Sequence, residues 1–169
     1  MTLTTISIIV ATAIYVAYNA ISLALFGIPE SLSNTYYLYK EKGNKGWLFP
    51  LMMYAVVALM MPAWITLSEG SDFQFLAFLA PSAIAFVGTA PAFKSDDLEN
   101  VVHSAAAIVA AICSLAWVAV ITPYWCVILI WLGLISGVLT ITKTYSCLIY
   151  WLETIAFGST FTAAIMYSL

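Results

Sequence analysis

The sequence has no arginine, one histidine and few charged residues of any kind. Five lysines and eight acidic residues make up 8% of the 169 residues, whereas about a quarter of a soluble domain is charged. So few charges cannot cover an 18.4 kDa globular protein with groups that water solvates. Without arginine or a basic face, the chain also lacks the usual features of nucleic-acid recognition, so no nucleic acid is expected among its partners.

The chain also lacks the residue sets that most metal sites and hydrolases need. A single histidine and scattered acids do not supply the ligands of a zinc site, and the three cysteines lie in apolar runs without a CxxC spacing. No GxSxG, HExxH or Walker motif is present. We therefore expect no metal and no cofactor, and we favour a non-enzymatic protein over an enzyme.

Apolar residues are abundant: they make up 64% of the chain and give a mean hydropathy of +1.03. A helix that spans a bilayer needs about 20 such residues. Segments of this length predict an all-α polytopic membrane protein, a bundle of six transmembrane helices in a single domain over residues 1–169. The predicted spans are residues 4–26, 47–67, 73–92, 101–121, 124–142 and 146–168.

All five lysines lie in alternate connections between the predicted spans. Lys40, Lys42 and Lys45 follow the first span, Lys94 follows the third and Lys143 follows the fifth. The connections after the second and fourth spans contain no lysine. The positive-inside rule therefore predicts that the lysine-containing connections are cytoplasmic and that both termini lie on the opposite side.

Two ionisable residues lie inside predicted spans, where such residues are costly and commonly functional. His103 comes early in the fourth span, and Glu153 lies about seven residues into the sixth. Both spans begin on the lysine side, so the helical rise places Glu153 ~10 Å deep and His103 closer to the surface. This depth allows the two to share a pocket that opens toward the lysine side.

Each of the two has a functional and a purely structural interpretation. Glu153 either handles a proton or binds a lipid headgroup, or it is hydrogen-bonded to a hydroxyl of a neighbouring helix. His103 either acts as a base, proton relay or headgroup contact, or it is a helix-start histidine bonded to the acidic residues before it.

Two polar connections on the lysine side could contribute to such a pocket. Residues 28–37, with the sequence IPESLSNTYY, are predicted to fold back along the interface and cover the bundle, either as an interfacial anchor or as the lining of a headgroup site. Asp96, Asp97 and Glu99 precede the fourth span, where they are expected to cap the helix and complement its dipole, or to contact a cation. The predicted pocket residues are His103, Glu153, Glu30, Ser33, Thr35 and Tyr36.

Small residues predict where helices pack closely. Gly133 and Gly137 form a small-xxx-small pattern in the fifth span, which predicts close helix packing and a homo-oligomer that uses this glycine face. The fourth span carries alanines and serines around much of its circumference, which predicts a helix that sits among the others.

Three features resemble the layout of the six-span Frag/DRAM/Sfk family and of the DUF998 group of prokaryotic membrane proteins. They are the loop with Pro29 and Glu30 after the first span, the sequence VHSAAA at residues 102–107, and Glu153 inside the sixth span. Members of these families are associated with lipid asymmetry, lipid remodelling, and autophagic or lysosomal membranes. The resemblance implies membrane lipids as partners and His103, Glu153 and Glu30 as functional positions. The chain departs from the eukaryotic members in its very short loops and its lack of arginine.

Three functions are open from the sequence. The first is a non-enzymatic, lipid-interacting membrane protein with a polar intramembrane pocket open to the lysine-rich side. The second is a small oligomeric channel or proton-coupled transporter that uses Glu153 and His103. The third is a membrane-embedded lipid hydrolase, and an accessory subunit without a site is the simplest alternative to all three.

Overall fold

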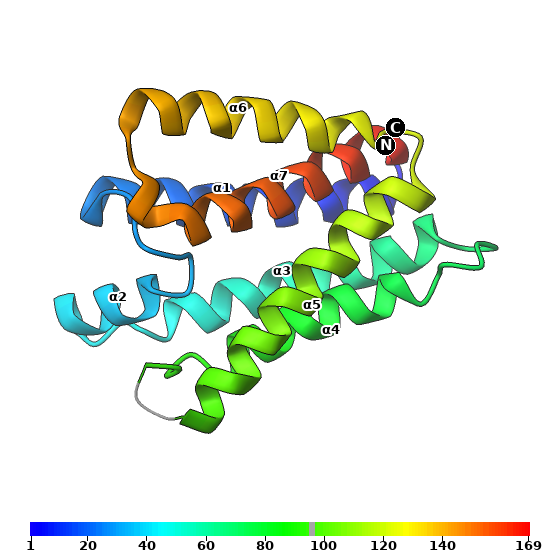
Figure 1. Cartoon of the computed structure of the whole chain (residues 1–169). Coiled ribbons are helices and arrows are strands. Elements are labelled where there is room, and N and C mark those ends of the chain that lie inside the picture. Colours follow the sequence, from blue (N-terminus) through cyan, green and yellow to red (C-terminus); the bar gives the residue numbers. More distant parts are fainter. Residues whose placement is uncertain (95–96) are drawn as a thin grey trace.

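The computed structural model describes residues 1–94 and 97–169, and within these ranges all regular secondary structure is helical. This confirms the predicted all-α class. Figure 1 shows the helices in chain order. They are α1 (Leu3–Phe26), α2 (Thr35–Gly43), α3 (Leu48–Leu67), α4 (Leu76–Thr89), α5 (Asp97–Ile121), α6 (Cys126–Thr142) and α7 (Leu148–Ser168), with a short 3₁₀ turn, η1 (Tyr145–Cys147), before α7.

Among the described residues, four helical segments are long and apolar enough to cross a membrane. They are α1, α3, α5 and the segment Tyr145–Ser168 that joins η1 to α7. The other two apolar helices, α4 and α6, have 14 and 17 residues, fewer than the roughly 20 that a bilayer requires. By length and composition, four of the six predicted spans are therefore able to cross a membrane.

Local sequence sets where the helices begin and end. The Thr2 side chain caps α1 by accepting the Thr5 backbone N–H at 3.1 Å. The helix ends at Gly27, whose φ of 74° is readily adopted only by glycine, and Pro29 follows two residues later. At the end of α6, Lys143 takes the left-handed conformation with φ 55°, and the chain then turns back into α7.

The apolar helices run back and forth between two ends of the bundle. Figure 1 shows both termini at one end, together with the α3–α4 and α5–α6 connections. The segment between α1 and α3 that contains α2, and the α4–α5 and α6–α7 connections, lie at the other. Because these three segments contain every lysine of the chain, we call this the lysine end.

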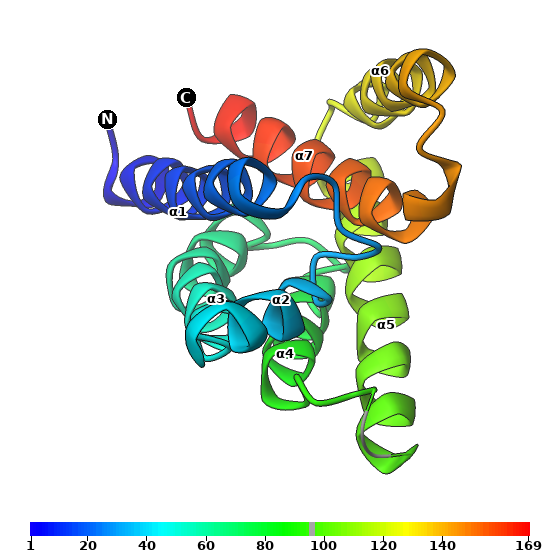
Figure 2. The same cartoon turned by 90° about the vertical axis from the view of Figure 1, so that its left-hand side faces the viewer.

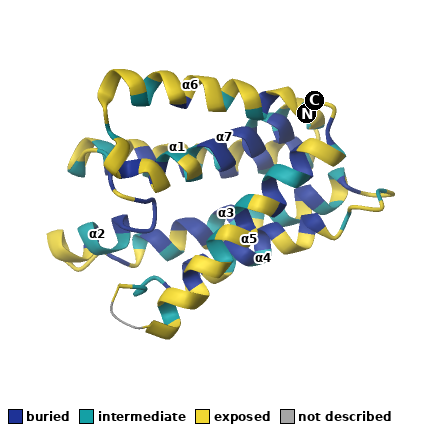
Figure 3. Ribbon diagram, viewed as in Figure 1, coloured by how far each residue is buried: buried dark blue, intermediate teal, exposed yellow. Residues whose placement is uncertain are grey.

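The core lies between α1, α3, α4, α5 and α7, while α6 is peripheral. Helix α4 packs between α3 and α5, and α1 packs against both α3 and α7. Figure 2 shows α6 standing apart beside α7, and Figure 3 shows that it is mostly exposed. Large apolar side chains such as Ile112 and Ile130 are 62% and 57% exposed on outer faces. Such faces are suited to lipid, where exposing an aliphatic side chain carries no hydrophobic penalty.

The close helix approach involves a glycine that the sequence analysis did not single out. A Cβ added to Gly158 of α7 would lie 2.6 Å from the ring of Trp131 on α6, so glycine is needed there. Added to Gly133 or Gly137, it would meet nothing within 4 Å. These two glycines therefore make no close helix contact with the part of the chain that the structure describes, and their role in contact with a second copy stays a prediction.

Helix α5 is not enclosed by the others, contrary to the expectation from its small residues. Ser104 and Ala105 are exposed on its outer face, because α5 packs on α4 and α7 through one side only. The small residues of its inner face serve a different purpose, since they leave space between the helices.

Candidate functional site

The polar segment after α1, residues 28–37, crosses the lysine end of the bundle, and we call it the polar strap. Figure 2 shows it running from α1 past α7 toward α5 before it turns back into α2. The Leu32 side chain is 1% exposed and belongs to the core. The segment therefore folds back over the bundle, as its sequence predicted, and its central residues are buried. These are Ser31, Leu32, Ser33, Asn34 and Thr35.

Helix α7 holds one side of the polar strap. The Glu153 carboxylate accepts the Leu32 backbone N–H, with 2.6 Å between Oε2 and N. One turn earlier, the Tyr150 backbone N–H donates to the Glu30 carbonyl at 3.2 Å. An ionisable residue inside an apolar helix thus satisfies a backbone group that the strap would otherwise bury without a partner.

Helix α5 holds the other side through His103. Its Nε2 lies 3.0 Å from Ser33 Oγ, and its Nδ1 lies 2.9 Å from the Ala90 carbonyl oxygen. Because a carbonyl only accepts, Nδ1 carries a hydrogen, and in the neutral ring Nε2 accepts from the Ser33 hydroxyl. The Phe93 ring stacks on the imidazole with 4.4 Å between centroids. The histidine is thus fixed on both nitrogens and on one face.

Glu30 lies on the surface. Its carboxylate pairs with Lys94 Nζ at 3.0 Å, and the two side chains are 68% and 45% exposed. The same ammonium donates to Asn34 Oδ1 at 2.8 Å, and the Lys94 backbone N–H donates to Tyr37 Oη at 2.7 Å. An ion pair this exposed contributes about 1 kcal/mol or less. Its role is to join the polar strap to the α4–α5 connection.

Thr35 and Tyr36 hold the start of α2. The Thr35 hydroxyl donates to the Leu32 carbonyl at 2.6 Å and lies 2.6 Å from Tyr18 Oη, which therefore donates to it. The Tyr36 ring packs so closely on Gly46 that an added Cβ there would lie 2.9 Å from it. Both residues therefore support the strap.

The predicted acidic cap of α5 is seen in part. Asp97 and Glu99 lie in the first turn of α5, where their charge complements the helix dipole. Glu99 Oε2 accepts the Ala92 backbone N–H at 3.0 Å and so closes the connection before the helix. Asp96 lies outside the described residues. Within residues 1–94 and 97–169, no three His, Cys, Asp or Glu side chains gather in a way that could hold a metal ion.

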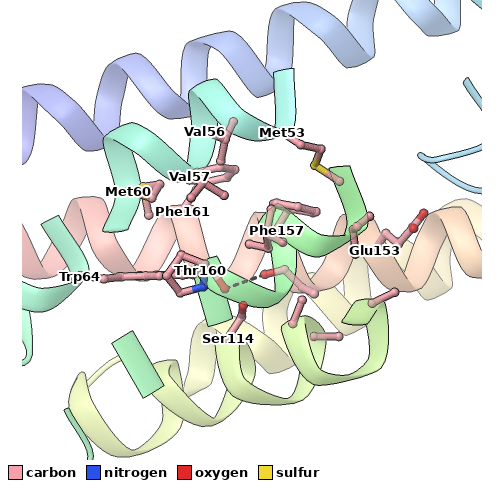
Figure 4. Close-up of a pocket in the computed structure, with 17 residues that line it drawn as sticks. Met53, Val56, Val57, Met60, Trp64, Ser114, Glu153, Phe157, Thr160 and Phe161 are labelled. Carbon is pink, nitrogen blue, oxygen red and sulfur yellow. Dashed lines mark hydrogen bonds between the residues drawn. The ribbon is translucent and has the colours of Figure 1, made fainter. Parts of the chain in front are cut away.

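A cavity of about 50 Å³ lies between α3, α4, α5 and α7, and we call it the interhelical cavity. Figure 4 shows Glu153 at one end of it and Trp64, Ser114 and Thr160 grouped at the other. Its remaining lining is apolar and includes Met60, Phe157 and Phe161. The cavity is thus an apolar space with a polar group at each end.

Small residues of α5 make room for this cavity. Ala107, Ala110, Ala111 and Ser114 all line it, at the i, i+3, i+4, i+7 spacing of one helix face. This spacing was the signal in the sequence that could have revealed the cavity. It was obscured because other small residues, such as Ala105, continue around the outer face of the same helix.

The structure therefore separates the predicted pocket residues into two groups. Glu153 lines the interhelical cavity, whereas His103 and the other predicted residues do not. His103 lies in the second turn of α5, beyond the lysine end of the cavity, and its ring faces the strap. Glu153 and His103 are nevertheless linked, because they bond to the adjacent strap residues Leu32 and Ser33.

Comparisons of the chain with protein-family models, curated proteins and solved structures find no match. The resemblance in layout to the Frag/DRAM/Sfk and DUF998 proteins therefore stays a prediction.

Proposed function

We propose that this chain is an integral membrane protein that crosses the bilayer six times and binds a lipid-like ligand in the interhelical cavity, without catalysing a reaction. The observation that carries the proposal is the cavity itself, an apolar space among four helices whose lysine end holds a single carboxylate beneath the polar strap.

The arrangement of the helices supports six spans. At 1.5 Å per residue, α4 and α6 are ~21 Å and ~26 Å long, against a hydrocarbon core of ~30 Å. Each nevertheless runs from one end of the bundle to the other beside a longer helix (Figure 1). A local thinning of the bilayer accommodates a short span at modest cost. By the positive-inside rule, the lysine end and the polar strap lie on the cytoplasmic side.

The lining of the cavity favours a lipid-like ligand. Side chains around an empty space lose dispersion contacts on one side, so an apolar chain that enters the cavity restores them. The cavity volume of about 50 Å³ is well below the ~150 Å³ of a cavity that admits benzene. A slender chain end therefore fits better than a ring.

A pair of substitutions on α5 tests the proposal. Ala111→Phe fills the cavity, because Ala111 lines it, whereas Ala105→Phe adds the same ring to the exposed outer face. We expect wild type and Ala105→Phe, purified in mild detergent, to retain a lipid-like molecule in native mass spectrometry, and Ala111→Phe to lose it. All three should keep the same elution volume and helix content.

Two results would contradict this proposal. One is retention of the same ligand by all three proteins. The other is a wild-type protein that carries no ligand and whose thermal stability does not respond to added lipid.

A further inference from the structure

Trp64 lies at the end of the interhelical cavity away from Glu153, and its ring contacts that of Trp117 at a tilt of 44°. The two indoles differ in hydrogen bonding. The rings of Trp64 and Trp117 are 5.6 Å apart between centroids. Trp117 Nε1 donates to Ser68 Oγ at 2.7 Å. Trp64 is 2% exposed, yet its Nε1 has no hydrogen-bond partner among residues 1–94 and 97–169. Buried donors are nearly always paired, so this indole N–H calls for a partner from outside the chain.

The unpaired indole nitrogen faces the cavity. Figure 4 shows it turned toward the Thr160 and Ser114 hydroxyls, which line the same end. Thr160 Oγ1 donates its hydrogen to the Ala156 carbonyl at 2.8 Å, so its lone pairs are left to accept. The Ser114 hydroxyl can both donate and accept. This end of the cavity therefore offers one fixed donor beside groups that accept.

A donor beside acceptors complements a hydroxyl group. We propose that the inner end of the cavity is a binding site for the hydroxyl of an apolar alcohol, whose oxygen accepts from Trp64 Nε1 and whose hydrogen is donated to Thr160 or Ser114. The inference rests on the proposed function, and it names the ligand class. A hydrocarbon tail would leave the indole N–H unpaired. A carboxylate or phosphate would be buried there without a cation, at high cost.

The length of the site suits an alcohol of moderate length. Thr160 follows Glu153 by seven residues on α7, which corresponds to ~10 Å along the helix. Within about 50 Å³, the cavity holds the hydroxyl, at Trp64, and the first carbons of such an alcohol. The rest of the alkyl chain extends out of the cavity, which is not closed on all sides. A water molecule is the competing occupant, because it also donates and accepts.

Photolabelling with octanol separates these occupants. The full-length protein in lipid nanodiscs is irradiated with a diazirine-bearing octanol, and the labelled residues are mapped by mass spectrometry. We expect labels on cavity-lining residues of α3, α5 and α7, and displacement by unlabelled 1-octanol. In Trp64→Phe the 1-octanol concentration needed for displacement should rise about tenfold. Trp131→Phe is the matched control, because the Trp131 indole bonds to Thr162, outside the cavity.

A diazirine-bearing octane without the hydroxyl completes the experiment. It should label wild type and Trp64→Phe equally, which also shows that the variant keeps its cavity. Thr160→Val removes an acceptor with little change of shape, so it should weaken the binding of octanol and leave the binding of octane unchanged. If Trp64→Phe leaves octanol displacement unchanged, or octane competes as well as octanol in wild type, the hydroxyl site is refuted while the cavity proposal stands. If neither probe labels the cavity, the proposed function fails as well.

Discussion

Leu32 and Ser33 are neighbours in the polar strap, yet each is hydrogen-bonded to a different helix. The Leu32 N–H donates to Glu153 on α7, and the Ser33 hydroxyl bonds to His103 on α5. Side chains of two helices thus fix a strap that lies over the lysine end of the interhelical cavity. In an apolar bundle, each of these polar groups would be costly to bury without its partner.

The Leu32–Glu153 hydrogen bond can be tested by two substitutions of Glu153, one that keeps a hydrogen-bond acceptor and one that removes it. Glu153→Gln keeps a side-chain oxygen that can accept the Leu32 N–H, whereas Glu153→Leu leaves that buried N–H unpaired. We expect Glu153→Leu to lose about 1–3 kcal/mol of stability and Glu153→Gln to lose much less. Thermal unfolding in detergent, followed by tryptophan fluorescence, measures the difference. Equal stability of the two variants would show that the hydrogen bond does not hold the strap.

The sequence identified Glu153 and His103 as important because polar residues stand out in apolar spans. It placed Ser33 in the same pocket as His103, but it could not assign the hydrogen bonds or identify Leu32, since Leu32 and Ser33 lie 121 and 70 residues from Glu153 and His103 in the chain. Trp64 was missed for a related reason. A tryptophan near the end of an apolar span is typical of a side chain at the membrane–water interface. Only the packed structure shows that the Trp64 indole is buried and that its N–H has no partner among the described residues.

At the scale of helices, the contact between α6 and α7 depends on one glycine. The Trp131 ring lies against Gly158, and its indole donates to Thr162 at 3.2 Å. Gly158→Ala places a methyl group 2.6 Å from the ring, so we expect a loss of about 1–3 kcal/mol in stability. Replacing Trp131 by leucine in the same chain should recover part of the loss. The readout is the unfolding temperature in detergent.

Two glycines of α6 provide the matched control. Gly133→Ala and Gly137→Ala add the same methyl group where nothing lies within 4 Å, so the fold of the single chain should not be destabilised. A loss as large as that of Gly158→Ala would refute this account of the helix contact. If the glycine face binds a second copy, as predicted from the sequence, these two substitutions change the oligomeric state instead.

The glycines show how far a sequence pattern determines helix packing. A GxxxG spacing shows that a helix can be approached closely, but the rotation of the helix decides whether a neighbour is there. Helix α6 contacts α7 through Trp131, whereas Gly133 and Gly137 have no described atom close enough to meet an added Cβ. Boundaries of long apolar helices were easier to predict, because hydropathy is a local property. Helix α2 was missed because its nine residues include charged ones and have no apolar face.

At the scale of the whole molecule, the proposed protein crosses the membrane six times and has its lysine end inside the cell. The side of the membrane on which Glu153 and the polar strap lie follows from that topology. Helices α4 and α6 are its weakest elements, since both are shorter than a typical span. A test must therefore place labels on both sides of each of these two helices.

Single cysteines in a chain without Cys113, Cys126 and Cys147 provide the most direct measurement. Glu41, Asp72, Trp125 and Tyr145 are exposed positions in or beside the α1–α3, α3–α4, α5–α6 and α6–α7 connections. We predict that a membrane-impermeant maleimide labels cysteines at positions 72 and 125 in intact cells. Cysteines at positions 41 and 145 should be labelled only after the membrane is permeabilised. Because α5 crosses between 72 and 125, labelling of both from outside requires α4 to cross as well. Labelling of 125 and 145 from the same side would remove α6 as a span, and labelling of 72 and 125 from opposite sides would remove α4. Either result would contradict the six-span protein proposed here.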